Sequence, residues 1–204
     1  MVKSKKAISV LVIIGIGLLL LSGCGTNQAQ TQAQTQDNSK SGSTDQLPSL
    51  DSLVKYEPGV TKKLSDDEII AARDTVQKEI EAEYNVDYKT MPDKPTFLTY
   101  LTDGAQQQVM ATYPAGLKKM KDSQAMNRTT KVTIGHVTVT SDNSMTILSE
   151  FLVSIQTKNG NSLHDYHGQY FMKKVNEKWL IDNQTLTESK PDNQGQKAQN
   201  SQSK

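Results

Sequence analysis

Alternating apolar and polar residues in the last third of the chain constrain its fold more than any other feature. From Thr129 onward, apolar side chains recur at every second position, the period of strands with one buried face. The four runs span 129–140, 145–157, 162–175 and 178–185. The segments between them, 141–144, 158–161 and 176–177, are short and rich in Asn, Asp, Ser and Gly. Short turns join antiparallel neighbours, so the sequence predicts a four-stranded antiparallel meander.

The first of these strands contains a phase slip. Its apolar positions before Gly135 are out of step with those after His136. A β-bulge at Gly135-His136 would restore the alternation and bend the sheet. At that place His136 is interpreted as an edge residue rather than as a catalytic base.

The strands follow a helical region whose first element has a clear start. Ser65 and Glu68 form a capping box, and Leu64 with Ile69 occupies the positions of a hydrophobic staple. Apolar residues then recur every three or four positions up to Tyr84, which predicts a helix over 66–84 with one face on the core. Its other face carries Arg73, Lys78 and Glu81, and we expect that face to be solvated.

The next segment is expected to be helical but broken. Pro92 and Pro95 interrupt the chain, and the apolar cluster at 97–101 predicts a short helix that stops at Gly104. Pro114 is expected to open another short helix. The resulting fold class is α+β: one long and several short N-terminal helices packed on a curved, antiparallel, four-stranded sheet.

The amino terminus has the pattern of a secretory signal. Lys3, Lys5 and Lys6 precede an apolar run over 7–21. That run ends in Leu21-Ser22-Gly23-Cys24, which resembles the lipobox of bacterial lipoproteins.

The resemblance implies cleavage between Gly23 and Cys24, and lipidation of Cys24, which becomes the first residue of the mature chain. It places the mature chain on the extracytoplasmic face of the cell membrane, held by its lipid. The alternative is an uncleaved signal anchor in which Cys24 is incidental.

Composition divides the remaining chain. All Phe, Trp and Tyr residues lie between Tyr56 and Trp179, whereas the flanking segments are rich in Gln, Ser, Asn and Thr and cannot bury enough apolar surface to fold. We predict a signal peptide at 1–23, a disordered tether at 24–49, a globular domain at 50–187 and a disordered tail at 188–204.

Charge and residue counts exclude several kinds of partner. The formal net charge is +1, and removing the three lysines of the signal leaves the mature chain at about −2. Neither nucleic acid nor anionic lipid is favoured as a partner. One Cys and three His offer little for a zinc site or a disulfide framework, so we expect no metal and no cofactor.

The order of elements, and above all the ending 168–183, GQYFMKKVNEKWLIDN, resembles the NTF2-like (nuclear-transport-factor-two-like) superfamily. The resemblance covers about 66–187 and implies a cone, in which helices lean into the concave face of a curved sheet around a pocket. Some members are isomerases or dehydratases. Many others only bind, including extracytoplasmic domains of conjugation and type IV secretion platforms.

Candidate site residues are few. Asp165 and His167 share a strand face and could form a carboxylate and general base, although an exposed strand start is the simpler interpretation. His164 points the other way, so it cannot share a metal with His167. Tyr170 and Trp179 are core anchors or, alternatively, line the mouth of a pocket.

The sequence therefore predicts a non-catalytic, lipid-anchored extracytoplasmic module that binds other envelope proteins or itself, for example in a conjugation or secretion apparatus. The alternative is a small-molecule-binding or enzymatic NTF2-like domain. That alternative requires an enclosed concavity lined by convergent polar groups, and the enzymatic form fails if Phe151, Tyr170 and Trp179 fill the space between the sheet and the helices.

Overall fold

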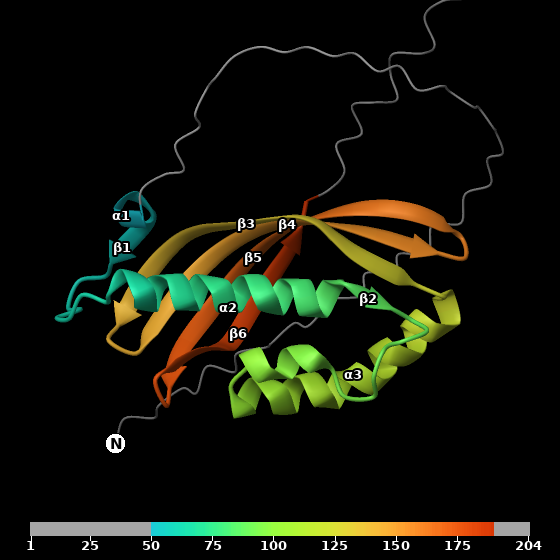
Figure 1. The fold of residues 1–204 in the computed structure, drawn as a ribbon, viewed down its shortest axis with the longest axis horizontal. Helices are drawn as coiled ribbons and strands as arrows, with labels where there is room; N and C mark the ends of the chain where they lie inside the picture. Colours follow the sequence, from blue (N-terminus) through green and yellow to red (C-terminus); the bar gives the residue numbers. More distant parts are fainter. Residues whose placement is uncertain (1–49, 190–204) are drawn as a thin grey trace, which may run out of the picture.

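The structure is a computed structural model and describes residues 50–189 (Figure 1). Its helices are α1 (Leu50–Leu53), α2 (Asp66–Tyr84), the 3₁₀ helix η1 (Thr96–Tyr100) and α3 (Asp103–Ser123). Its strands are β1 (Val54–Tyr56), β2 (Val86–Asp87), β3 (Met126–Ser141), β4 (Ser144–Thr157), β5 (Gly160–Val175) and β6 (Lys178–Glu188). The predicted signal peptide, Cys24, the tether and the tail from residue 190 onward lie outside the described residues. The tail was predicted to begin at 188, but Glu188 is the last residue of β6 and the Ser189 N–H donates to Asp165 O at 2.8 Å.

The sheet has six strands in mixed orientation, so the prediction of four antiparallel strands was wrong in number and in type. Its order is β1-β3-β4-β5-β6, and β2 also pairs with β3. The strand β1 runs parallel to β3, with Val54 opposite Val137. Both additional strands have three residues or fewer, too short to show a period of two. The α+β class is confirmed: α2 crosses one face of the curved sheet (Figure 1).

The four long strands and their turns are confirmed. The hairpins β3–β4, β4–β5 and β5–β6 pair antiparallel along their lengths. At the last turn Asn176 and Glu177 have φ angles of 48° and 63°, as a two-residue hairpin turn of the primed type requires.

The predicted bulge lies where the sequence slips. The register of β3 against β4 shifts between Ile134 and Val137, so that Ile134 opposite Ser149 and Val137 opposite Ile147 both face the core. Arg73 of α2 donates to the carbonyl oxygens of Gly135 and Ile134 at 2.6 and 2.7 Å. The expectation that Arg73 belongs to a solvated helix face was wrong, because the bulge supplies two carbonyl acceptors within its reach.

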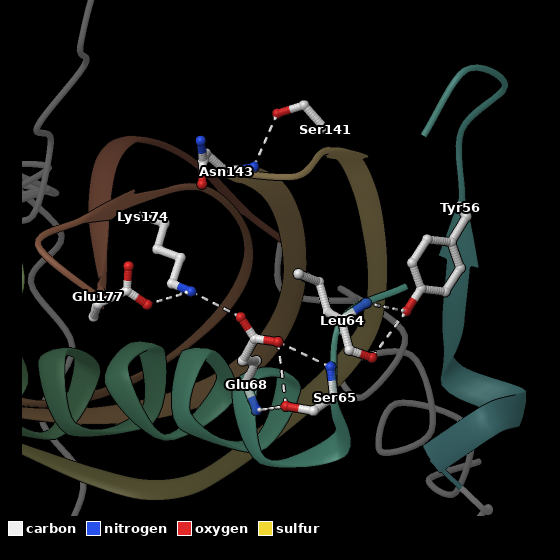
Figure 2. Close-up of polar contacts among 8 residues, drawn as sticks. All are labelled: Tyr56, Leu64, Ser65, Glu68, Ser141, Asn143, Lys174 and Glu177. Carbon is white, nitrogen blue, oxygen red and sulfur yellow. Dashed lines mark hydrogen bonds and ion pairs between the residues drawn. The ribbon is translucent and has the colours of Figure 1, made fainter. Parts of the chain in front are cut away.

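The start of α2 is fixed as the capping box predicts (Figure 2). The Ser65 side chain accepts from the Glu68 backbone N–H, and Glu68 Oε2 accepts from the Ser65 N–H at 2.9 Å. The other oxygen of Glu68 pairs with Lys174 Nζ at 2.9 Å, and Lys174 also pairs with Glu177 at 2.8 Å. These contacts tie the first turn of α2 to the β5–β6 hairpin.

The segment after η1 differs from its prediction. A 3₁₀ helix is present at 96–100, but α3 continues without a break from Asp103 to Ser123. Gly104 lies in its first turn instead of stopping a helix, and Pro114 lies inside it instead of opening one. Pro114 is exposed, so the carbonyl of Met110, which loses its hydrogen bond at a proline, can bind water instead.

The core lies between α2 and the inward face of the sheet. The rings of Tyr84, Phe151 and Tyr166 lie within 5.1–5.8 Å of one another, centroid to centroid. A Cβ on Gly168 would lie 2.5 Å from Ser149 Oγ and 2.6 Å from the Tyr170 ring, so the packing at this position requires a residue without a side chain.

Candidate functional site

The main cavity of the described residues lies between the end of α2, the loop before η1, and α3. Its volume is about 320 Å³, at the small end of the range of about 300–1,000 Å³ that ligand pockets span. It is mostly apolar and partly open to solvent. The apolar lining comes from Ala82, Tyr84, Val86, Met91, Pro92, Pro95, Phe97, Val109, Tyr113, Ala115, Gly116, Leu117 and Met120, and the polar lining from Glu83, Thr96, Thr112, Lys119 and Asn127.

The wall formed by the loop before η1 is held by hydrogen bonds at both ends. After α2 ends, the Asn85 side chain accepts from the backbone N–H of Thr129 at 2.8 Å. Asp87 then closes a turn by accepting from the N–H groups of Thr90 and Met91, each at 3.0 Å. Farther along, Tyr113 of α3 donates its hydroxyl to the carbonyl of Pro92 at 2.8 Å.

The helix α3 is attached to the sheet at both of its ends, and the cavity lies beside its middle part. Its start is attached to β6, because the Thr102 N–H donates to Ile181 O and the Thr102 hydroxyl donates to Asp182, each at 2.9 Å. Its end is attached to the sheet through Gln124, which adopts φ 54°, and the following turn into β3. Between these two attachments, α3 and the end of α2 border the cavity from different sides.

Asn127 is the most buried polar side chain of the cavity wall. It is 4% exposed, and its side-chain oxygen has no hydrogen-bond partner. Its amide nitrogen makes only a long contact of 3.9 Å to the Met120 sulfur, which is a weak acceptor. A buried amide oxygen without a partner has lost its hydrogen bonds to water and gained none from the protein, which costs stability.

A pair of acidic side chains adjoins the cavity on α2. Glu79 is fully buried, with both carboxylate oxygens unpartnered, and the Oε2 atom of Glu83 is also buried without a partner. Burial raises the pKa of both carboxyl groups, and the neighbouring Glu83 raises the pKa of Glu79 further. Both environments therefore favour the neutral acid.

The space that these two acids share is very small. It has a volume of about 10 Å³ and is lined by both acids together with Gln184 and apolar side chains. This is roughly the room that one water molecule needs. Glu83 lines this space and the main cavity as well, so it connects the acid pair with the larger cavity.

The sequence-predicted pair Asp165 and His167 lies on the outward face of β5, and both side chains are exposed. The structure does not pair them with each other. His167 Nε2 lies 2.7 Å from the Ser189 hydroxyl, and its Nδ1 lies 3.6 Å from Glu150.

His164 makes a closer set of contacts than His167. Its Nδ1 lies 2.7 Å from Glu188 and its Nε2 lies 2.7 Å from the Ser162 hydroxyl. This order of carboxylate, imidazole and hydroxyl is that of a nucleophile with its base. None of these three residues lines either cavity described above.

Tyr170 and Trp179 are core residues with exposures of 0% and 4%. Neither lines the main cavity or the small space beside it. Together with Phe151 they belong to the buried core cluster that also contains residues of α2.

Sequence reasoning missed Glu79, Glu83 and Asn127. A signal for the two acids was present, because they lie three and seven positions after Val76, on the apolar side of the helical pattern. An acid at such a position is either buried or at the edge of the buried face. Asn127 gave no comparable signal, since it precedes the first strand that the alternation predicted.

The described residues contain neither a metal site nor a membrane-spanning helix. Within 50–189, no three His, Cys, Asp or Glu side chains are grouped so that they could hold a metal ion. In the same range, no helix is long and apolar enough to cross a membrane.

Comparisons with known proteins give distant likenesses only. No family model and no curated protein matches the chain. Among solved structures, the periplasmic domain of DotI aligns with a TM-score of 0.49 at 12% identity, over 62% of this chain and 98% of that one. An IcmL-like type IV secretion system protein from Legionella pneumophila aligns with a TM-score of 0.45 at 12% identity, over 63% and 97%.

A protein from Nostoc punctiforme with a cystatin-like fold gives a TM-score of 0.43 at 10% identity, over 64% of this chain and 97% of that one. Similarity at this level assigns no function to the chain.

Proposed function

We propose that this chain is a lipid-anchored extracytoplasmic module of the bacterial cell envelope, with an NTF2-like domain that binds a protein partner and catalyses no reaction. The lipid is carried by Cys24, and the tether at 24–49 holds the domain on the order of 25–30 Å from the membrane. The partner is an envelope protein or a second copy of the chain, as in a conjugation or secretion apparatus.

One observation supports binding over catalysis. Phe151, Tyr170 and Trp179, with exposures of 1%, 0% and 4%, are packed in the core and line neither cavity. Of the two acids, Glu79 meets only a space of about 10 Å³, which admits no organic substrate. Glu83 also lines the main cavity, but no histidine, cysteine or second carboxylate lines that cavity with it.

The exposed large hydrophobic side chains do not gather on one element. The exposed large hydrophobic side chains of the described residues are distributed over α2, α3, β4 and β5, as Ile70, Met110, Leu148 and Leu163. Single apolar residues on a surface are ordinary, and these four form no continuous apolar patch.

The anchor is tested by mass spectrometry of the amino-terminal peptide from native membranes. The expected peptide begins at Cys24 and carries a diacylglyceryl group on sulfur. In the matched variant Cys24→Ala, the chain should carry no lipid and should not be cleaved before residue 24. An unmodified wild-type chain that begins at Met1 would refute the anchor.

The binding role is tested by crosslinking in intact cells, with wild type compared with Cys24→Ala. We expect a discrete crosslinked species, containing an envelope protein or a second copy, that is reduced when the lipid on Cys24 and the cleavage before it are lost. A wild-type chain that stays uncrosslinked, in cells where a known envelope complex crosslinks, would contradict the role.

A further inference from the structure

Three side chains gather where the start of β5 meets the end of β6, and the proposed partner binding does not use them: Ser162, His164 and Glu188. We propose that Ser162 is an acylation site of this chain, with the imidazole of His164 as its base and Glu188 as the group that orients the imidazole. The substrate class is a small uncharged acyl donor with a good leaving group. This inference is independent of the anchor on Cys24 and of the protein partner.

The hydrogen bonds of His164 fix which of its nitrogens carries the proton. Its Nδ1 lies 2.7 Å from Glu188 Oε1, and an ionised carboxylate only accepts, so Nδ1 holds the proton. The Nε2 atom of the neutral ring is then an acceptor. The Ser162 hydroxyl, 2.7 Å away, therefore donates to it, as a nucleophile donates to its base.

Packing against the core holds this imidazole in place. Its ring stacks on that of Tyr166, with centroids 6.2 Å apart and an interplanar angle of 13°. Tyr166 is buried and packs in turn against Phe151 and Tyr84. The His164 side chain is only 17% exposed, whereas Ser162 is exposed. A donor from solvent can therefore reach the hydroxyl while the base keeps its position.

A second set of serine, histidine and carboxylate on β5 and β4 lacks this order. His167 Nε2 lies 2.7 Å from the Ser189 hydroxyl, but its Nδ1 lies 3.6 Å from Glu150, which is beyond hydrogen-bond distance. Among the described residues, no carboxylate is therefore close enough to fix the protonated nitrogen of His167. We expect Ser189 to react more slowly than Ser162.

The reaction balances as an acyl transfer. The Ser162 oxygen bonds to the carbonyl carbon of the donor, and its proton passes to His164 Nε2. The bond between that carbon and the leaving group breaks, and the leaving group departs with the electron pair. The imidazole then gives the proton to the leaving group or to water.

The exposed position of the three residues selects the donor and preserves the product. They line neither cavity of the described structure, so no pocket positions a large substrate. Reaction therefore needs a small donor whose leaving group departs readily, such as an aryl ester or a thioester. The serine ester that forms has an alkoxide leaving group, which departs much less readily. The acyl group therefore stays on Ser162, and the chain completes no catalytic cycle.

The experiment measures acetylation of the full chain by p-nitrophenyl acetate. Short pulses are followed by digestion and mass spectrometry, with acetylated lysine peptides as the measure of donor exposure. Ser141 is the matched control, because its hydroxyl lies 2.9 Å from the Ser144 hydroxyl and not beside an imidazole. We expect Ser162 to be acetylated about a hundredfold faster than Ser141, at the low end of what a general base contributes.

Two variants assign the roles of the other two side chains. In His164→Gln, the rate at Ser162 should fall to that at Ser141, while the rate at Ser189 stays unchanged. In Glu188→Ala, the rate at Ser162 should fall about tenfold, because the imidazole loses the acceptor that fixes its proton. Backbone amide NMR spectra check that both variants retain the fold, and the wild-type comparison of Ser162 with Ser141 does not depend on them.

Any of three results would overturn the proposal. The first is acetylation of Ser162 no faster than that of Ser141, and the second is a wild-type rate at Ser162 in a folded His164→Gln chain. The third is release of more than a single equivalent of p-nitrophenol in excess of that from Ser162→Ala, because the ester would then turn over. None of them bears on the lipid anchor or on the crosslinked partner, so failure here is distinguishable from failure of the proposed function.

Discussion

The two halves of α2 differ in whether their buried and partly buried polar side chains have partners. In the first half, Ser65, Glu68 and Arg73 all have hydrogen-bonding partners, and Glu68 is paired with Lys174 across to the β5–β6 hairpin (Figure 2). In the second half, Glu79 and Tyr84 are buried with side-chain oxygens that lack partners. The first half holds the helix on the sheet, while the second retains unsatisfied groups beside the main cavity.

The acids of the two halves also have opposite pKa shifts. The backbone N–H of Ser65 and the Lys174 ammonium lower the pKa of Glu68 to about 2. Burial raises the pKa of Glu79 well above its usual value. Polar groups with satisfied partners stabilise the charged form, and buried groups without partners oppose it.

The largest expected effect comes from the ring that ends the second half of α2. Tyr84→Ala should lower the free energy of unfolding by about 3–5 kcal/mol, because the ring packs against Phe151 and Tyr166 in the core. Tyr84→Phe should leave it unchanged or slightly higher, because the lost hydroxyl has no partner. Urea unfolding measures both, and a costly Tyr84→Phe would show that the hydroxyl is satisfied.

The next effect comes from the first half. Arg73→Met should cost about 2–3 kcal/mol, because it removes two charge-assisted hydrogen bonds to the bulge carbonyls. The control Lys78→Met lies on the exposed side of the same helix, in an ion pair of 3.7 Å, and should change stability by no more than about 0.5 kcal/mol. Equal costs in the two variants would refute a special role for Arg73.

The pH dependence of the second half follows from the raised pKa of Glu79. A folded-state pKa above the unfolded value means that stability is fully present below about pH 4.5 and is lost as pH rises through the folded pKa. The slope is at most about 1.4 kcal/mol per pH unit for one proton. Glu79→Gln should flatten it in urea titrations at several pH values.

Glu83→Gln provides a second measurement of the acid pair, because the same burial raises the pKa of Glu83. If both variants retain the wild-type slope, the pair is already ionised in the folded chain.

The smallest effect belongs to the cap of α2, with the opposite sign in pH. Because the folded pKa of Glu68 is about 2, its contribution is present above about pH 4.5 and is lost as pH falls toward 2. Glu68→Gln should cost about 1 kcal/mol at pH 7 and clearly less at pH 2, where about half of the Glu68 carboxyl groups are protonated.

A double-mutant cycle with Lys174→Met isolates the ion pair from the capping box. The coupling between positions 68 and 174 should be about 0.2–1 kcal/mol. A cost for Glu68→Gln that is equally large at pH 7 and pH 2 would assign the effect to packing instead of charge.

Periodicity predicted the elements that bury one regular face. The bounds of α2, and those of the four long strands to within three residues, follow from apolar spacing and from turn and cap residues. The Gly135-His136 slip located the bulge. The short strands β1 and β2 were not predicted, because two or three residues are too few to show an alternating pattern. The continuity of α3 through Pro114 depends on the exposure of that position, which depends on tertiary packing.

The candidate site was harder to predict than the fold. Its wall is assembled from α2, the loop before η1, α3 and the first residues of β3, and no local pattern reports how such segments converge. Asn127 is one polar residue among many in the sequence, and only its burial distinguishes it. The titratable cluster that the sequence did single out, around Asp165 and His167, lies instead on an exposed strand face.

The contact of Arg73 with the bulge has a consequence for the folding pathway. It joins positions that are 61 and 62 residues apart, so it cannot form until the β3–β4 hairpin and α2 have met. A hairpin slipped by one residue would turn its apolar side chains to the wrong face and would not present the two carbonyls to the guanidinium. Docking of α2 therefore favours the correct register of β3. Because this contact is distant in sequence, refolding should be slower than the formation of the hairpin turns alone.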